Sequence, residues 1–227
     1  MHADVHATGH RLTATRAGRI ARELRIHAPF TFGGTVVGIL IIVALVYLHV
    51  PRPVSATLFW ITHPAHVLLS ALVTTGLYRL HGSRRLFPTV VVGYVGSVGV
   101  ATVSDSVIPH LGELLVGLEH AHAHIGFIEK WWLVNPLALA GIALACLWPR
   151  TKVPHAGHVL LSTLASLFHV AMATGQTIGL GQALAIGAFL FLAVWVPCCT
   201  SDIVFPLLFV RPGAKAENPP AQTRADA

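Results

Sequence analysis

The chain has 227 residues, of which 54% are hydrophobic and only 11% are charged, with a formal net charge of +6. A soluble domain carries about 25% charged residues, so this chain lacks the polar surface that a water-facing fold needs. The basic residues lie between apolar stretches instead of forming one patch, which argues against a nucleic-acid-binding protein. The composition therefore predicts an integral membrane protein.

Six apolar segments follow one another along the chain. Between Arg25 and Arg79 the only charged residue is Arg52, and none occurs between Lys130 and Arg150. A helix needs about 20 apolar residues to cross the hydrocarbon core of a bilayer, and these intervals supply them. The fold class is predicted to be all-α, with six transmembrane helices over residues 30–50, 58–80, 87–109, 131–148, 155–175 and 183–209.

The positions of the basic residues predict the orientation. If the N-terminus is cytoplasmic, all of the 15 basic residues except Arg52 and Lys130 lie on the cytoplasmic side. This bias predicts a multi-pass protein of a bacterial-type inner membrane, in contact with lipid and with both termini in the cytoplasm. Residues 1–29 form an Arg- and His-rich cytoplasmic tail, and residues 211–227 a disordered one.

Two short motifs occur twice. Residues 63–70 read His-Pro-Ala-His-Val-Leu-Leu-Ser, and residues 155–162 read His-Ala-Gly-His-Val-Leu-Leu-Ser. The pattern Ser-Asp-x-Val-x-Pro occurs at 104–109 and again at 201–206. Paired histidines and an Asp-Pro pair are rare in apolar segments, so their recurrence in the same order predicts an internal repeat.

The repeat divides the chain into two halves of three helices, residues 30–113 and 131–210, joined by a His-rich outer loop over 114–130. Because three is an odd number, the second half enters the bilayer from the opposite side. Inverted repeats of this kind are common in secondary transporters, whose substrate sites lie near the membrane midplane between the halves. Gly93, Gly96 and Gly99 permit close helix packing, and a homodimer is compatible with this pattern.

Of the nine acidic residues, only Asp105 and Asp202 lie within the predicted spans. A carboxylate at membrane depth is costly unless it is paired, solvated or bound to a cation. The histidines of each His-x-x-His pair share one helix face and can bind one metal ion. The candidate metal ligands are His63, His66, Asp105, His155, His158 and Asp202. Inverted topology permits either two stacked sites or convergence of the motifs, and two related sites are the favoured interpretation.

Several other residues extend or qualify this site. Pro109 and Pro206 follow the two aspartates by four residues and are candidate helix breaks, since proline frees a backbone carbonyl. Cys198 and Cys199 are interpreted as buried and inert, with soft-metal binding as the alternative. Glu113 is assigned to the edge of the outer loop. The candidate accessory metal-collecting residues are His110, His120, His122 and His124.

The three-plus-three layout, the His-rich outer loop and the paired half-motifs resemble the small inner-membrane metal and cation exporters of the lysine-exporter-type superfamily. The resemblance covers residues 30–210 by architecture, and no residue roles are transferred from it. It implies export of a cation.

The sequence thus favours a secondary transporter, and not an enzyme, for a divalent transition metal: zinc, nickel, cobalt, manganese or iron. Exchange against protons is expected, because imidazole and carboxylate lose protons when they bind a metal. The alternatives are a membrane-embedded metal-dependent enzyme, a haem protein, and a proton-coupled transporter of a non-metal solute.

Overall fold

The computed structural model describes residues 16–81, 85–148, 152–174 and 178–209, and every regular element in these ranges is a helix. This confirms the predicted all-α class for the described residues. The longer elements are α1 (Arg16–Tyr47), α2 (Arg52–His81), α7 (Trp131–Leu147), α8 (Lys152–Ala173) and α9 (Leu180–Leu208). Between α2 and α7 lie α3 (Leu86–Tyr94), η1 (Val95–Gly99), α4 (Val100–Thr102), η2 (Val103–Val107), α5 (Ile108–Val116) and α6 (Gly126–Glu129).

Three helical segments are long and apolar enough to cross a membrane: Arg52–Leu80, Leu86–Val116 and Leu180–Pro197. Shorter apolar stretches occur in α1, α7 and α8. Many large apolar side chains also point away from the bundle, among them Phe32, Leu40, Leu115 and Leu184. Such an outward apolar surface is unusual in a soluble monomer and is what lipid contact requires, so the fold indicates a membrane protein.

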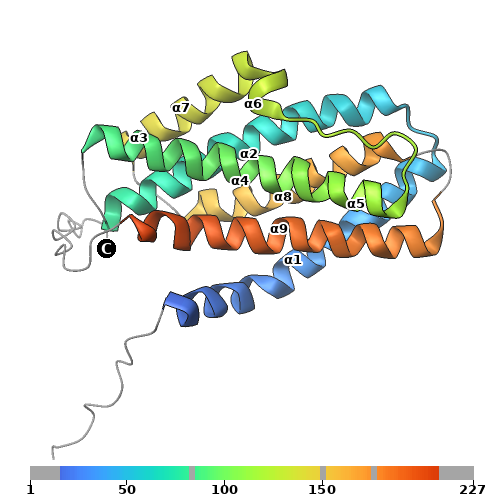
Figure 1. Cartoon of the computed structure of the whole chain (residues 1–227), viewed down its shortest axis with the longest axis horizontal. Helices are drawn as coiled ribbons and strands as arrows, with labels where there is room; N and C mark the ends of the chain where they lie inside the picture. Colours follow the sequence, from blue (N-terminus) through green and yellow to red (C-terminus); the bar gives the residue numbers. More distant parts are fainter. Residues whose placement is uncertain (1–15, 82–84, 149–151, 175–177, 210–227) are drawn as a thin grey trace, which may run out of the picture.

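The long helices run side by side along the longest axis of the molecule (Figure 1). The end of α2, the start of α3 and the end of α9 lie at one end of the bundle, and the turn from α1 to α2 lies at the other. The segment after α5 then runs back along the bundle to α6, near the middle of its length. The predicted outer loop is therefore a strap laid over the helices. We call residues 117–125 the strap.

Residues 86–116 form one continuous helical rod that contains two π-helical turns, η1 and η2. The residues at each junction keep right-handed helical dihedral angles, so the axis is not interrupted. A π-turn adds a residue to the helix and often occurs at a functional position. Asp105 lies in η2, in the middle of the turn.

The predicted helix breaks at Pro109 and Pro206 are wrong. Pro109 lies in the first turn of α5, directly after the π-helical turn η2, and the residue before it keeps right-handed helical dihedral angles. α9 runs through Pro206 and ends at Leu208. In the first Ser-Asp-x-Val-x-Pro motif the helix is therefore irregular before the proline. The irregularity is the π-helical turn η2, which contains Asp105.

α2 is the central helix and packs most extensively against α8 and α7. Its polar residues Thr62, His63, His66, Ser70 and Thr74 are all buried, so the polar face of α2 points into the bundle. The apolar contacts between helices include three clusters of buried side chains, the smallest of which is the pair Val159 and Val194. The other two are larger. The larger of them contains Ile42, Phe59, Leu167, Phe168, Val170, Met172, Ile186 and Leu190, and the smaller Val67, Val98, Ala101, Val134 and Ala138.

Gly141 sets the distance between α7 and α2. A Cβ at this position would overlap the backbone carbonyl oxygen of Leu68 and approach Ala71. We expect Gly141→Ala to destabilise the bundle by about 1–3 kcal/mol, because backbone cannot move aside as a flexible side chain can. Thermal unfolding in detergent measures the effect. Gly181→Ala is the control, since nothing lies within 4 Å of its Cβ, and equal melting temperatures for the two variants would contradict this packing.

Candidate functional site

Asp105 is the centre of a buried polar cluster, which we call the inner site. Its Oδ2 accepts hydrogen bonds from His63 Nδ1 at 2.9 Å and from His66 Nδ1 at 2.6 Å. Its Oδ1 accepts hydrogen bonds from Ser104 Oγ at 2.7 Å and Ser162 Oγ at 3.0 Å. Asp105 and His66 are fully buried and His63 is 1% exposed. The structure therefore brings together the three candidate ligands of the first half.

The hydrogen bonds assign the tautomers of the two imidazoles. A carboxylate only accepts hydrogen bonds, so His63 and His66 both carry a proton on Nδ1 and a lone pair on Nε2. Neither Nε2 atom has a hydrogen-bond partner among the described residues, although both atoms are buried. An imidazole that donates Nδ1–H to a carboxylate and presents Nε2 is the usual form of a metal-binding histidine.

The second half contributes to the same cluster. His158, on α8, is fully buried and stacks on His66 with ring centroids 4.6 Å apart. Ser162, one turn further along α8, is the Oδ1 partner described above. His158 of the second His-x-x-His motif thus lies beside the histidines of the first. The preference for two related sites stays a prediction. The side chains of His155, Asp202, Cys198 and Cys199 lie outside the described residues.

A second group of donors lies on the surface at the end of the strap. We call His122, His124 and Glu129 the outer site. Their ligand atoms all lie within 4.8 Å of one another. His124 Nδ1 donates to Glu129 Oε2 at 3.1 Å, and Ile125 N donates to Glu129 Oε1 at 3.0 Å. His122 and His124 were predicted as metal collectors, and Glu129 joins them from α6.

The other predicted collectors lie elsewhere. His120 pairs with Glu119 at 3.9 Å, at the far end of the strap. His110 lies on α5 and faces Glu113. Of the four outer histidines, two therefore belong to the outer site.

Glu113 lies within helix α5, and not at the edge of the outer loop as the sequence analysis assigned it. The helix extends past Pro109 to Val116 and ends at Gly117, whose φ of 70° is a left-handed conformation that glycine adopts without strain. Glu113 is therefore a helical residue and is only 1% exposed. Its Oε1 accepts a hydrogen bond from His169 Nδ1 at 2.7 Å, and its Oε2 lies 3.4 Å from His110 Nδ1. His169 was not predicted.

The strap is seated directly over these buried groups. Ser106 Oγ donates to the carbonyl of His124 at 2.6 Å, and His124 N donates to His169 Nε2 at 3.4 Å. Directly after the strap, Gly126 at the start of α6 packs so closely on His63 that a Cβ would overlap the Nε2 atom of the imidazole. The start of α6 and the inner site are therefore in contact.

Phe59 connects the buried groups. Its ring is fully buried and stacks on His63 with centroids 5.3 Å apart. It also meets His169 edge-on at 5.3 Å and His124 at 6.0 Å. A continuous series of aromatic and imidazole rings thus leads from the surface to Asp105.

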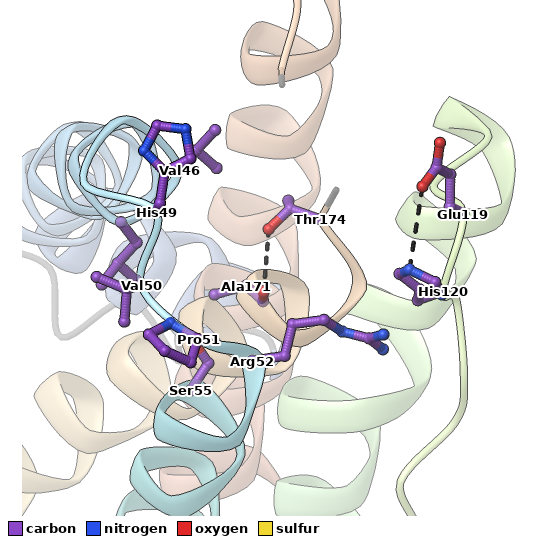
Figure 2. A pocket seen from close by; sticks show the side chains of 11 residues that line it. Val46, His49, Val50, Pro51, Arg52, Ser55, Glu119, His120, Ala171 and Thr174 are labelled. Atoms are coloured by element: carbon purple, nitrogen blue, oxygen red, sulfur yellow. Dashed lines mark hydrogen bonds and ion pairs between the residues drawn. The ribbon is translucent and has the colours of Figure 1, made fainter. Parts of the chain in front are cut away.

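A pocket of about 570 Å³ lies beside the strap, at the end of the bundle where α1 turns into α2. Figure 2 shows Arg52 between this turn and the end of α8, with Glu119 and His120 on the facing wall. Arg52 Nε donates to the carbonyl of Met172 at 2.9 Å, which holds the guanidinium in place. The pocket thus combines Arg52 with apolar walls and with further polar groups. The apolar residues include Leu45, Val46 and Val50, and the polar ones are His49, Ser55, Glu119, His120 and Thr174.

Comparisons with protein-family models, with curated proteins and with solved structures find no match to this chain. The resemblance to the lysine-exporter-type superfamily therefore remains a prediction. Among the described residues, only the outer site has three ligand atoms from His, Cys, Asp or Glu side chains all within 4.8 Å of one another. The function therefore has to be argued from the chemistry of the inner site, the outer site and the cluster around Glu113.

The outer site makes a direct prediction. His122→Ala removes one of its three donors and is expected to weaken Zn²⁺ binding there by about tenfold or more, as loss of a supporting group around a metal already costs that much. Calorimetric zinc titration of the purified chain measures this change. His120→Ala is the control, because His120 belongs to the same strap but lies outside the trio. Equal zinc affinities for the two variants would contradict the outer site.

Proposed function

We propose that this chain is a secondary transporter that moves a divalent transition-metal cation across a membrane in exchange for protons. The observation that carries the proposal is the inner site. A fully buried carboxylate accepts hydrogen bonds from two histidines whose Nε2 atoms have no partner among the described residues. His158, from the other half, is stacked on His66. In a membrane bundle such a cluster is a functional candidate because of its cost.

The donor set suits the proposed cargo. Imidazole nitrogen and carboxylate oxygen bind zinc, nickel, cobalt, manganese and iron, and geometry more than donor type selects among them. Binding through Nε2 keeps the Nδ1–H bonds to Asp105, which orient both rings. The negative charge of Asp105 offsets part of the charge of the cation. Release of the cation restores a cluster that can take up protons, and this is the basis for exchange.

The proposed transporter has six membrane-spanning helices, an inverted repeat and a defined orientation in the membrane. All six long helices would cross the bilayer, with α1, α7 and α8 contributing the shorter apolar stretches. Two inverted halves of three helices would meet at α2 and α8. The basic residues favour cytoplasmic termini in a bacterial-type inner membrane. The resemblance to the lysine-exporter-type superfamily favours export.

Transport by the reconstituted chain tests this function. Liposomes containing the full chain, a metal-sensitive dye and a pH-sensitive dye are mixed in turn with zinc, nickel, cobalt, manganese and iron(II). We expect metal influx for at least one of them, accompanied by proton efflux, and neither signal in protein-free liposomes. Absence of metal flux for all five would contradict the proposal.

A proton-coupled transporter of a non-metal solute is the second candidate, and the pocket around Arg52 favours it. A cavity of about 570 Å³ exceeds what a bare cation occupies, and a fixed guanidinium is suited to a carboxylate. Transport that continues after chelation of all metal, and that is lost in Arg52→Gln, would support this candidate over the first.

A further inference from the structure

We propose that the pocket beside the strap binds the head group of a phospholipid, with the lipid phosphate on Arg52 and the glycerol part of the lipid against the apolar wall. We call this pocket the head-group site. Lipid binding here requires only a chain that lies in a membrane, so it is independent of metal transport.

The pocket lies at the level where a lipid head group is expected. Arg52 begins the segment Arg52–Leu80, which is long and apolar enough to cross a membrane, and it is the only charged residue between Arg25 and Arg79. Tyr47, at the end of α1, is 81% exposed, and tyrosine is typical of the membrane–water interface. The charge at the end of a span and the exposed aromatic ring near it both indicate the head-group region.

Arg52 has hydrogen-bond donors left for a ligand. Its Nε–H group donates to the carbonyl of Met172 at 2.9 Å, and the guanidinium points toward the wall formed by the strap (Figure 2). Glu119 lines the same pocket but pairs with His120, and Arg52 makes no ion pair with a described residue. The N–H groups on the two Nη atoms therefore remain for an anion. Two of them match two oxygens of one phosphate.

His49 adopts a backbone conformation that favours glycine. Its φ is 50°, which is the only positive φ of a non-glycine residue in the described ranges. His49 N donates to the carbonyl of Val46 at 3.0 Å, and Val50 N donates to that of Leu45 at 2.9 Å. This is the Schellman pattern that ends a helix, and glycine is the usual residue at this position because a Cβ is strained there. The imidazole lines the pocket, so the strain indicates a use for this side chain.

The size and the walls of the pocket suit an amphiphile better than a small inorganic ion. Its volume of about 570 Å³ lies within the range of about 300–1,000 Å³ that is typical of small-molecule sites. Leu45, Val46 and Val50 line it on the side of α1. A free phosphate would leave these side chains facing water, whereas the glycerol and first methylene groups of a lipid would cover them, and this burial favours binding.

Native mass spectrometry of the full chain tests the head-group site. The delipidated chain in detergent is titrated with phosphatidylethanolamine, and the bound lipids are counted. We expect one lipid that binds more tightly than the rest. Arg52→Gln should weaken it by about tenfold or more, because charge-assisted hydrogen bonds are lost. Lys130→Gln is the matched control, since Lys130 is the other basic residue predicted on the outer side and lies over the Trp60 ring, outside the pocket.

His49→Gly separates lipid binding from folding. Glycine relieves the strained φ, so the melting temperature of the delipidated chain should stay the same or rise. The affinity for the lipid should nevertheless fall by about two- to tenfold, because a hydrogen-bond donor at the pocket is removed. A His49 side chain with no part in binding would leave the lipid affinity of this variant unchanged, which would overturn the role of His49.

Competing anions identify the source of the bound group. Excess inorganic phosphate or hexanoate is added to the chain with its lipid bound, and retention of the lipid supports the head-group site. Displacement by phosphate would assign the pocket to a free anion, and displacement by hexanoate to the carboxylate solute of the second candidate function. Either displacement would overturn the lipid assignment, and so would equal lipid affinities for the wild type and Arg52→Gln.

Discussion

Asp105→Asn is expected to abolish metal transport by the reconstituted chain. The carboxylate accepts hydrogen bonds from four donors, two imidazole N–H groups and two hydroxyls. An asparagine side chain accepts on its oxygen only, and its NH₂ group would face donors on the other side. At least one histidine must then change tautomer or lose its partner, and the charge that offsets the cation is gone.

The same change should also lower stability. Each buried donor left without an acceptor costs about 1–3 kcal/mol, so a fall in the unfolding temperature is expected together with the loss of flux. Asp105→Glu keeps the negative charge, so some metal binding should survive in this variant. It therefore separates the effect of the lost charge from the effect of the lost hydrogen bonds. Glu119→Gln provides the surface control. Normal metal flux in Asp105→Asn would show that the buried carboxylate has no part in transport.

Gly126→Ala is expected to impair transport almost as strongly, although residue 126 carries no ligand. A Cβ at this position would overlap His63 Nε2, the atom through which His63 would bind a metal. The imidazole or the strap must move, and overpacking of this kind costs about 1–3 kcal/mol. We expect a reduction in flux of about tenfold or more, because small displacements of ligating groups have large effects on rates.

Gly99→Ala is the matched control for this variant. It adds the same methyl group to a helix of the same bundle, where nothing lies within 4 Å of the new Cβ. Proteoliposome flux and thermal unfolding are measured for both variants. If Gly126→Ala transports metal as well as Gly99→Ala does, the close packing of Gly126 on His63 has no part in transport.

Much of the fold could be predicted from the sequence, because apolar length and the positions of charges carry that information. Each predicted span lies over one of the long helices. The repeated motifs also identified His63, His66 and Asp105, which the structure brings together. They identified His158 as well, as a candidate ligand of a second, related site. Histidine and aspartate are rare enough in apolar helices for their repetition to be informative.

The meeting of the two halves could not be predicted, because it depends on the relative depth of antiparallel helices. Periodicity places His66 and His158 on helix faces but says nothing about the level at which α2 and α8 cross. The 4.6 Å stacking of their rings follows from packing. Pro109 was misleading as a helix break, because the helical rod continues from η2 through Pro109 into α5.

Glu113 and His169 were missed for different reasons. Glu113 was assigned to the loop because Pro109 was taken to end the helix, although Gly117 is a good C-terminal stop and His110 lies one turn away. His169 stands alone in an apolar segment without a repeat partner, so only the fold could bring it to Glu113.

The metal content of the purified chain tests the central claim most directly. Elemental mass spectrometry is applied to the wild type and to Asp105→Asn, as isolated and after incubation with zinc, nickel, cobalt, manganese or iron(II) followed by desalting. We predict stoichiometric metal in the wild type and less in the variant, with the difference equal to the share held by the inner site. Equal metal content in the two proteins, or none in either after every incubation, would contradict the assignment of the Asp105 cluster as a metal site.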